Sequence, residues 1–124
     1  MMKVLFTFPG QGPQRPGMLQ QLPQGDALLD RASEVLHEDA RALDNAQALQ
    51  HTRAVQLCLL ITAVAHAHAL QRQGMEADIT CGLSIGAFPA AVVAGALAFD
   101  DALRLVSLRG ELMEQAYPQG LSLI

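Results

Sequence analysis

The sequence is poor in aromatic residues, basic residues and cysteine. Of its 124 residues 4% are aromatic and none is tryptophan, and 8 Lys and Arg stand against 12 Asp and Glu. The basic residues do not cluster, so the chain has no electrostatic footprint for nucleic acid. Its two cysteines, Cys58 and Cys81, lie in apolar runs without CxxC spacing. That pattern fits buried, reduced thiols in a cytoplasmic protein better than a disulfide or a metal site.

Long hydrophobic runs are also missing. The longest, residues 54–65, is interrupted by Gln56 and is shorter than the roughly 20 residues of a membrane span. The N-terminal run meets Pro9 and Gly10 before the h-region of a signal peptide could form. We therefore predict a cytoplasmic chain without a membrane partner.

Apolar residues nevertheless make up 51% of the chain, and their spacing predicts an α/β fold. We expect a helix at residues 52–73 that is apolar nearly all round and packs on several sides. Two strands alone cannot cover so many helices, so we expect the N-terminal part of a larger domain with a parallel sheet flanked by helices. Pro118 and Gly120 are predicted to end the last helix. The expected strands are residues 4–8, 78–83 and the first half of another at 121–124, and the other helices are residues 26–38 capped by Asp26, 85–94, and one capped by Asp100 or Asp101 that runs to 117.

The loop after the first strand, PGQGPQRPGM at residues 9–18, holds three glycines and three prolines. A plain turn needs fewer of them. Such a loop has a preset backbone and permits close approach by a ligand or by another segment.

The pentapeptide Gly82-Leu83-Ser84-Ile85-Gly86 matches the G-x-S-x-G pattern of a nucleophile elbow. A strand is predicted before it and a helix after it, as that turn requires. Ser84 would then be a nucleophile, with the N–H of Ile85 as a donor to the oxyanion. Alternatively, Ser84 caps the following helix, and the two glycines serve close packing.

A serine nucleophile needs a base, and the chain has four histidines: His37, His51, His66 and His68. His66 and His68 are two residues apart on different faces of one predicted helix, which is wrong for a shared metal ion. We expect all four to be structural or solvated. No metal site is predicted, and the base is missing from this chain.

Arg109 is flanked at helical spacing by Leu105, Val106, Leu112 and Met113. An arginine on an apolar face stays charged and needs a carboxylate or phosphate partner. The partner is either a substrate, or an Asp or Glu of the same fold, unless the side chain reaches the surface. Spacing leaves these alternatives open.

Four blocks together resemble the N-terminal part of the malonyl-CoA:acyl carrier protein transacylases. The blocks are FPGQGPQRPGM, HTRAVQLCLL, GLSIGAFPAAVVAGALAFDDALRLVSLRGELM and PQG. The resemblance implies Ser84 as the nucleophile, the N–H groups of Gln11 and Ile85 as oxyanion donors, and Arg109 as the ligand of the malonyl carboxylate. Gly10 and Gly12, which flank Gln11, are expected to border the substrate.

The resemblance also implies substrates and partners. They are malonyl-CoA and an acyl carrier protein with a phosphopantetheine-type arm, with no permanently bound cofactor and ping-pong transfer through a malonyl-serine. Residues 1–124 would be an incomplete large subdomain of an α/β-hydrolase-like acyltransferase domain. The small ferredoxin-like subdomain and the catalytic histidine of the family would lie downstream, so we expect little activity from this chain alone.

Two departures from the family pattern narrow the assignment. Leu83 stands where many members have histidine, and Phe88-Pro89 replaces a bulky aromatic pair. The form GLSIGAFPAA is most similar to the malonyl-transferase (epsilon) subunit of malonate decarboxylase, whose partner is a carrier subunit. The alternatives are a serine esterase or thioesterase of α/β-hydrolase type, which has no use for Arg109, and an inactive fragment or docking piece that exposes apolar surface.

Overall fold

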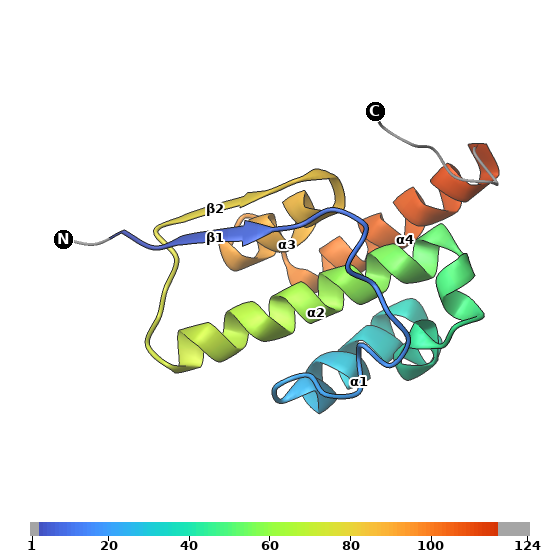
Figure 1. Ribbon diagram of the computed structural model, residues 1–124, viewed down its shortest axis with the longest axis horizontal. Helices are drawn as coiled ribbons and strands as arrows, with labels where there is room; N and C mark the ends of the chain where they lie inside the picture. Colours follow the sequence, from blue (N-terminus) through green and yellow to red (C-terminus); the bar gives the residue numbers. More distant parts are fainter. Residues whose placement is uncertain (1–2, 117–124) are drawn as a thin grey trace.

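The computed structural model describes residues 3–116, whose elements follow the predicted order (Figure 1). The α/β class is therefore confirmed. The expected strand at 121–124, Pro118 and Gly120 lie outside the described residues. The elements are β1 (Leu5–Phe8), α1 (Gly25–Leu36), α2 (Thr52–Arg72), β2 (Ile79–Gly82), α3 (Ala87–Val93) and α4 (Phe99–Ala116), with 3-10 helices η1 (Ala40–Asp44), η2 (Ala48–Gln50) and η3 (Ser84–Gly86).

The strands β1 and β2 pair in parallel, with Leu5 opposite Ile79 and Phe8 opposite Gly82. Because both strands run in the same direction, their carboxyl ends meet at one edge of the sheet. The glycine-rich loop that follows Phe8 and the elbow that follows Gly82 therefore emerge side by side (Figure 1).

The long helix α2 is the centre of the fold, as its all-round apolar pattern predicts. Figure 1 shows it between the strand pair and α1, with α3 and α4 alongside. Its side chains Leu57, Leu60, Ile61 and Val64 are fully buried. Ala67 packs with Phe6 and Phe8 of β1. By length and composition α2 could cross a membrane, but 61% of its apolar window is buried inside the protein. We therefore interpret it as the core helix.

Two helix starts differ from the sequence prediction. Gln24, in the left-handed conformation, precedes α1, which begins at Gly25, so Asp26 is not its cap. The helix α4 begins at Phe99, so Asp100 and Asp101 lie in its first turn, where carboxylates stabilise the positive end of the helix dipole.

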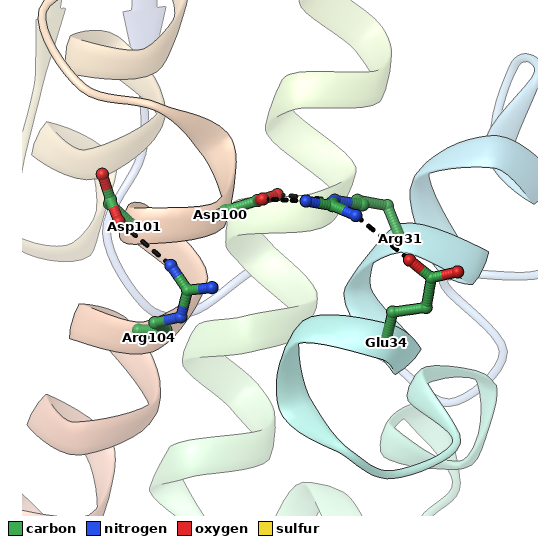
Figure 2. A network of polar contacts seen from close by, with 5 residues as sticks. All are labelled: Arg31, Glu34, Asp100, Asp101 and Arg104. Atoms are coloured by element: carbon green, nitrogen blue, oxygen red, sulfur yellow. Dashed lines mark hydrogen bonds and ion pairs between the residues drawn. The ribbon is translucent and has the colours of Figure 1, made fainter.

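Asp100 has a second role, because it joins α1 to α4 (Figure 2). Arg31 of α1 donates from Nε to Asp100 Oδ1 at 2.9 Å, and also from Nη2 to Asp100 Oδ2. The hydrogen bond from the Arg31 guanidinium lowers the pKa of the Asp100 carboxyl. Arg31 also pairs with Glu34, while Arg104 pairs with Asp101 one turn away on α4. This network is an exposed structural tie between helices.

Asp44, the last residue of η1, is a buried polar residue that the sequence analysis did not single out. Asp44 is 4% exposed, its carboxylate accepts from the N–H of Leu19 at 3.0 Å, and its carbonyl accepts from the N–H of Gly17 at 3.0 Å. Asp44 thereby fixes the far end of the glycine-rich loop against the helices. The spacing of apolar residues gave no sign of this tie.

The two cysteines have different surroundings, contrary to the prediction that both are buried. Cys58 is buried in α2, and burial raises the pKa of its thiol to about 12. Cys81 is exposed on β2.

At pH 8 we expect a disulfide reagent with a chromophoric leaving group to modify one thiol in the folded protein and two in denaturant, because the Cys58 thiolate is scarce and inaccessible. A Cys81→Ser variant that still reacts rapidly when folded would contradict this.

Candidate active site

Ser84 occupies a strained turn between β2 and α3. Its φ is +55°, in the left-handed region that side-chain-bearing residues rarely adopt. A Cβ at Gly82 would lie 1.9 Å from the carbonyl oxygen of Gly86, and one at Gly86 would lie 2.2 Å from the carbonyl oxygen of Phe8. Both glycines are therefore required by backbone contacts. This is the geometry of a nucleophile elbow.

The hydroxyl of Ser84 is exposed and is not used as a helix cap. Ser84 is exposed, and neither η3 nor α3 has a side-chain hydrogen bond at its N-terminal cap. The helix-cap interpretation is therefore wrong, whereas the close packing of the two glycines that accompanied it is correct. The predicted helix at 85–94 also begins differently, as a 3-10 turn that continues into α3.

The glycine-rich loop lies against the elbow. The Cβ position of Gly10 is 3.3 Å from the carbonyl oxygen of Leu83 and 3.9 Å from Cβ of Ser84. No loop or turn hydrogen bond within residues 3–116 uses the N–H of Gln11 or of Ile85. Gln11 is exposed, and Gly12 has a φ of +142° that favours glycine. The loop thus brings Gly10 to the serine, and no loop or turn carbonyl among residues 3–116 accepts from either candidate oxyanion donor.

Arg109 of α4 reaches the same place from the other side. Its Nη2 donates to Ser84 Oγ at 2.9 Å, and its Nη1 donates to Gln56 Oε1 at 2.9 Å. Its guanidinium carbon lies 5.7 Å from the centre of the Phe88 ring. Both of these hydrogen-bond partners are neutral, so among residues 3–116 its charge has no anionic partner within hydrogen-bonding distance.

Close packing of α4 on α2 sets the position of Arg109. A Cβ at the next residue, Gly110, would lie 2.4 Å from Cα of Arg53, so glycine permits this approach. Arg109 itself is half-buried, and Leu105 and Leu112 beside it are 47% and 54% exposed. The predicted apolar burial of Arg109 is therefore only partly correct, because one side of this face of α4 remains open.

Gln56 is a site residue that the sequence reasoning did not assign. It is 1% exposed within α2, where its Oε1 accepts from Arg109 and its Nε2 donates to Met113 Sδ at 3.2 Å. A buried amide needs such partners because desolvation without them is costly. The sequence does contain one signal that could have identified Gln56 as a site residue, because its polar amide interrupts the longest apolar run.

Within the described part of the chain, the four histidines have no contact with Ser84 that would identify one of them as a base. None of them hydrogen-bonds Ser84 among the described residues. His51 pairs through Nδ1 with Glu114 at 3.0 Å, and burial lowers the pKa of His68. Within residues 3–116 no group of three or more His, Cys, Asp or Glu is placed to hold a metal ion.

A separate cavity of about 780 Å³ lies behind the elbow, between β1, α2 and the glycine-rich loop. Ile85, Gly86 and His66 line it, but Ser84 and Arg109 do not. Ser84 and Arg109 therefore contact each other outside this cavity.

Comparison with known proteins identifies relatives over nearly the whole chain. The family model described as acyl transferase domain matches residues 5–123. The chain is 39% identical over 127 residues to the malonyl CoA-acyl carrier protein transacylase of Bacillus subtilis, covering 97% of this chain and 40% of that protein. It is 38% identical to the transacylase of Escherichia coli, covering 97% of this chain and 41% of that protein. The chain thus spans about two fifths of these relatives.

Solved structures agree with this likeness. A crystal structure of MCAT from Streptococcus pneumoniae superposes with a TM-score of 0.85 at 43% identity, covering 94% of this chain and 40% of that one. A malonyl-transacylase solved in complex with a type II PKS acyl-carrier protein superposes with a TM-score of 0.84 at 37% identity, with the same coverage. The fold of residues 3–116 is therefore similar to the corresponding part of these proteins.

Proposed function

Because the chain belongs to the acyl transferase domain family, we propose that it carries the nucleophile and the carboxylate-binding residue of a malonyl-CoA:acyl carrier protein transacylase. One observation supports this most strongly: the cation of Arg109 is 2.9 Å from the oxygen of Ser84 and has no anionic partner within hydrogen-bonding distance among the described residues. A serine esterase acting on neutral acyl groups has no use for such a cation.

The separation of these two groups selects the length of the acyl chain. Once Ser84 Oγ bonds to an acyl carbon, Nη2 of Arg109, which is 2.9 Å from that oxygen, is within reach of a carboxylate one methylene away from this carbon. A malonyl group places its carboxylate at that distance, and a guanidinium binds a carboxylate through two parallel N–H donors. A succinyl group carries its carboxylate one methylene farther from the serine, and an acetyl group leaves the cation without a partner.

The reaction transfers an acyl group in two balanced steps. Ser84 Oγ attacks the thioester carbon, the C–S bond breaks, and coenzyme A leaves as a thiol with the proton of the serine hydroxyl. The N–H groups of Gln11 and Ile85 stabilise the tetrahedral oxyanion, and Gly10 and Gly12 let the acyl group approach. In the second step the thiol of a carrier protein attacks the malonyl-serine ester, the bond between the acyl carbon and Oγ breaks, and the thiol proton returns to Ser84 Oγ.

The general base of this reaction is a histidine from outside residues 1–124. Support for this comes from the four histidines of the chain, none of which hydrogen-bonds Ser84 within the described residues. Without a base a serine hydroxyl is a weak nucleophile, so little transfer by residues 1–124 alone is expected. Imidazole in solution can stand in for such a histidine in an assay.

The carrier that we propose is the carrier subunit of malonate decarboxylase, which bears a CoA-like arm. Leu83 supports this narrower context, because many transacylases have histidine at that position, and here the side chain is 74% exposed beside the nucleophile. We expect malonyl to be transferred faster to this carrier than to an acyl carrier protein with a phosphopantetheine arm. Equal or slower transfer would assign the chain to ordinary acyl carrier protein transacylation.

The experiment that tests the proposed function is intact-mass spectrometry after mixing with malonyl-CoA, acetyl-CoA or succinyl-CoA in imidazole buffer. We expect a malonyl adduct, absent from a Ser84→Ala control, and slower labelling by the other two thioesters. Equal labelling by malonyl and acetyl groups would favour the esterase or thioesterase alternative. No adduct from any thioester, in a protein that remains folded, would favour a docking piece over a catalytic one.

A further inference from the structure

The two terminal nitrogens of Arg109 have partners of very different exposure. Nη1 donates to Gln56, which is 1% exposed, whereas Nη2 donates to the hydroxyl of Ser84, which is exposed. A buried amide cannot leave its partner without losing a hydrogen bond that water does not replace. The first contact is therefore permanent, and the second, here named the resting contact, is exchangeable.

Further contacts fix the orientation of the guanidinium. The amide of Gln56 is itself oriented by its hydrogen bond to Met113 Sδ, which leaves Oε1 directed at Arg109. The ring of Phe88 lies beside the guanidinium, in the range of a cation–π contact. Arg109 is thus held so that Nη2 stays at the nucleophile.

The resting contact engages the atom that must attack. Nucleophilic attack uses a lone pair of Oγ, and in the resting contact a cationic donor is bonded to that oxygen. A carboxylate is a stronger acceptor for a guanidinium than a neutral hydroxyl is. A carboxylate that arrives at Arg109 therefore displaces Ser84 from Nη2.

We propose that the resting contact restrains Ser84, and that the terminal carboxylate of a dicarboxylic acyl group releases the serine by taking over Nη2 of Arg109. Gln56 is the positioning residue of this exchange. The identity of the acyl group rests on the proposed function, but the restraint itself does not. An acyl group without a carboxylate leaves the contact between Arg109 and Ser84 in place. The site therefore discriminates against such groups in the rate of attack by Ser84 as well as in binding affinity.

A neutral electrophile tests the restraint without using a carboxylate or a thioester. Phenylmethanesulfonyl fluoride sulfonylates a serine hydroxyl and releases hydrogen fluoride, and intact mass follows the reaction in imidazole buffer. We expect Arg109→Met to react about 10-fold faster than the unsubstituted chain, which corresponds to the loss of one charged hydrogen bond. Arg104→Met, on the exposed face of the same helix, is the matched control and should not change the rate.

An equal or lower rate in Arg109→Met, including no reaction in either protein, overturns the proposal. If Arg109→Met does not fold, Arg109→Gln replaces it with the same expectation. Faster sulfonylation together with no malonyl adduct would retain the restraint and reject the proposed function. Unchanged sulfonylation together with a malonyl adduct would reject the restraint and retain the proposed function.

Gln56→Leu tests the positioning residue. We expect the malonyl-CoA concentration that gives half-maximal labelling to rise about 10-fold, because the guanidinium loses its fixed partner, while labelling by acetyl-CoA does not fall. A purely structural role would lower labelling by both thioesters together. That result would remove Gln56 from the proposal.

Discussion

Arg109→Met is expected to lower the rate of malonyl labelling of Ser84 by about 100-fold to 1,000-fold. The variant removes two charge-assisted hydrogen bonds to the malonyl carboxylate, worth about 3–4 kcal/mol together. Methionine has a similar length and no charge, so the labelling rates with malonyl-CoA and acetyl-CoA should become equal within a factor of about three. The measurement is the initial rate of adduct formation by intact mass, with each thioester at the same concentration.

The specificity of this effect is judged against Arg104→Met, which removes a cation from the same helix. Arg104 is exposed and pairs with Asp101, so its replacement should leave both labelling rates unchanged. A malonyl preference that survives in Arg109→Met would show that another group binds the carboxylate. An equal loss in both arginine variants would show a general charge effect on the binding of coenzyme A.

Gly86→Ala is expected to destabilise the folded state by about 4 kcal/mol or more, a large part of the stability of a small domain. The added methyl would lie 2.2 Å from the carbonyl oxygen of Phe8 and 2.9 Å from that of Pro9. Both are backbone atoms, so no side-chain rotation relieves the overlap and the end of β1 must separate from the elbow. The measurement is the urea midpoint of unfolding, followed by circular dichroism.

Gly10→Ala is the matched control for this substitution. Its added methyl would meet the carbonyl oxygen of Leu83 at 3.3 Å, which needs a shift of only a few tenths of an ångström. We expect a urea midpoint close to that of the unsubstituted chain. If Gly86→Ala unfolds at the same urea concentration as Gly10→Ala, the contact between β1 and the elbow is looser than the structure shows.

Much of the site was readable because it depends on local sequence. Gly82, Ser84 and Gly86 predict an elbow because two glycines and a strand-to-helix junction are what that turn requires. The structure confirms the turn and shows the overlap that excludes any side chain at the two glycines. Their role was predictable because the steric limits of a tight turn act within a few residues.

The partner of Arg109 could not be read in the same way. Helical spacing placed Val106 and Met113 beside it, but left a substrate, an internal carboxylate and the surface as equal alternatives. The structure shows that its hydrogen bonds go to Ser84 and Gln56, which are 25 and 53 residues away in sequence. No local pattern encodes such distances.

One wrong prediction concerns burial. Cys81 was predicted to be buried because its neighbours are apolar, yet β2 leaves that residue exposed. Apolar neighbours indicate burial only when the element is covered on that face, and coverage is a property of the packed fold.

By itself the sequence determined the order of strands and helices, the central place of α2 and the elbow at Ser84, because periodicity, turn chemistry and steric exclusion act over short stretches of chain. Only the tertiary structure decided that the glycine-rich loop, the elbow and Arg109 meet at one place. Parallel pairing of β1 with β2 aligns the first two, and the close approach of α4 to α2 at Gly110 brings the third. These contacts join residues far apart in sequence, so they exist only once the helices have packed around a common core.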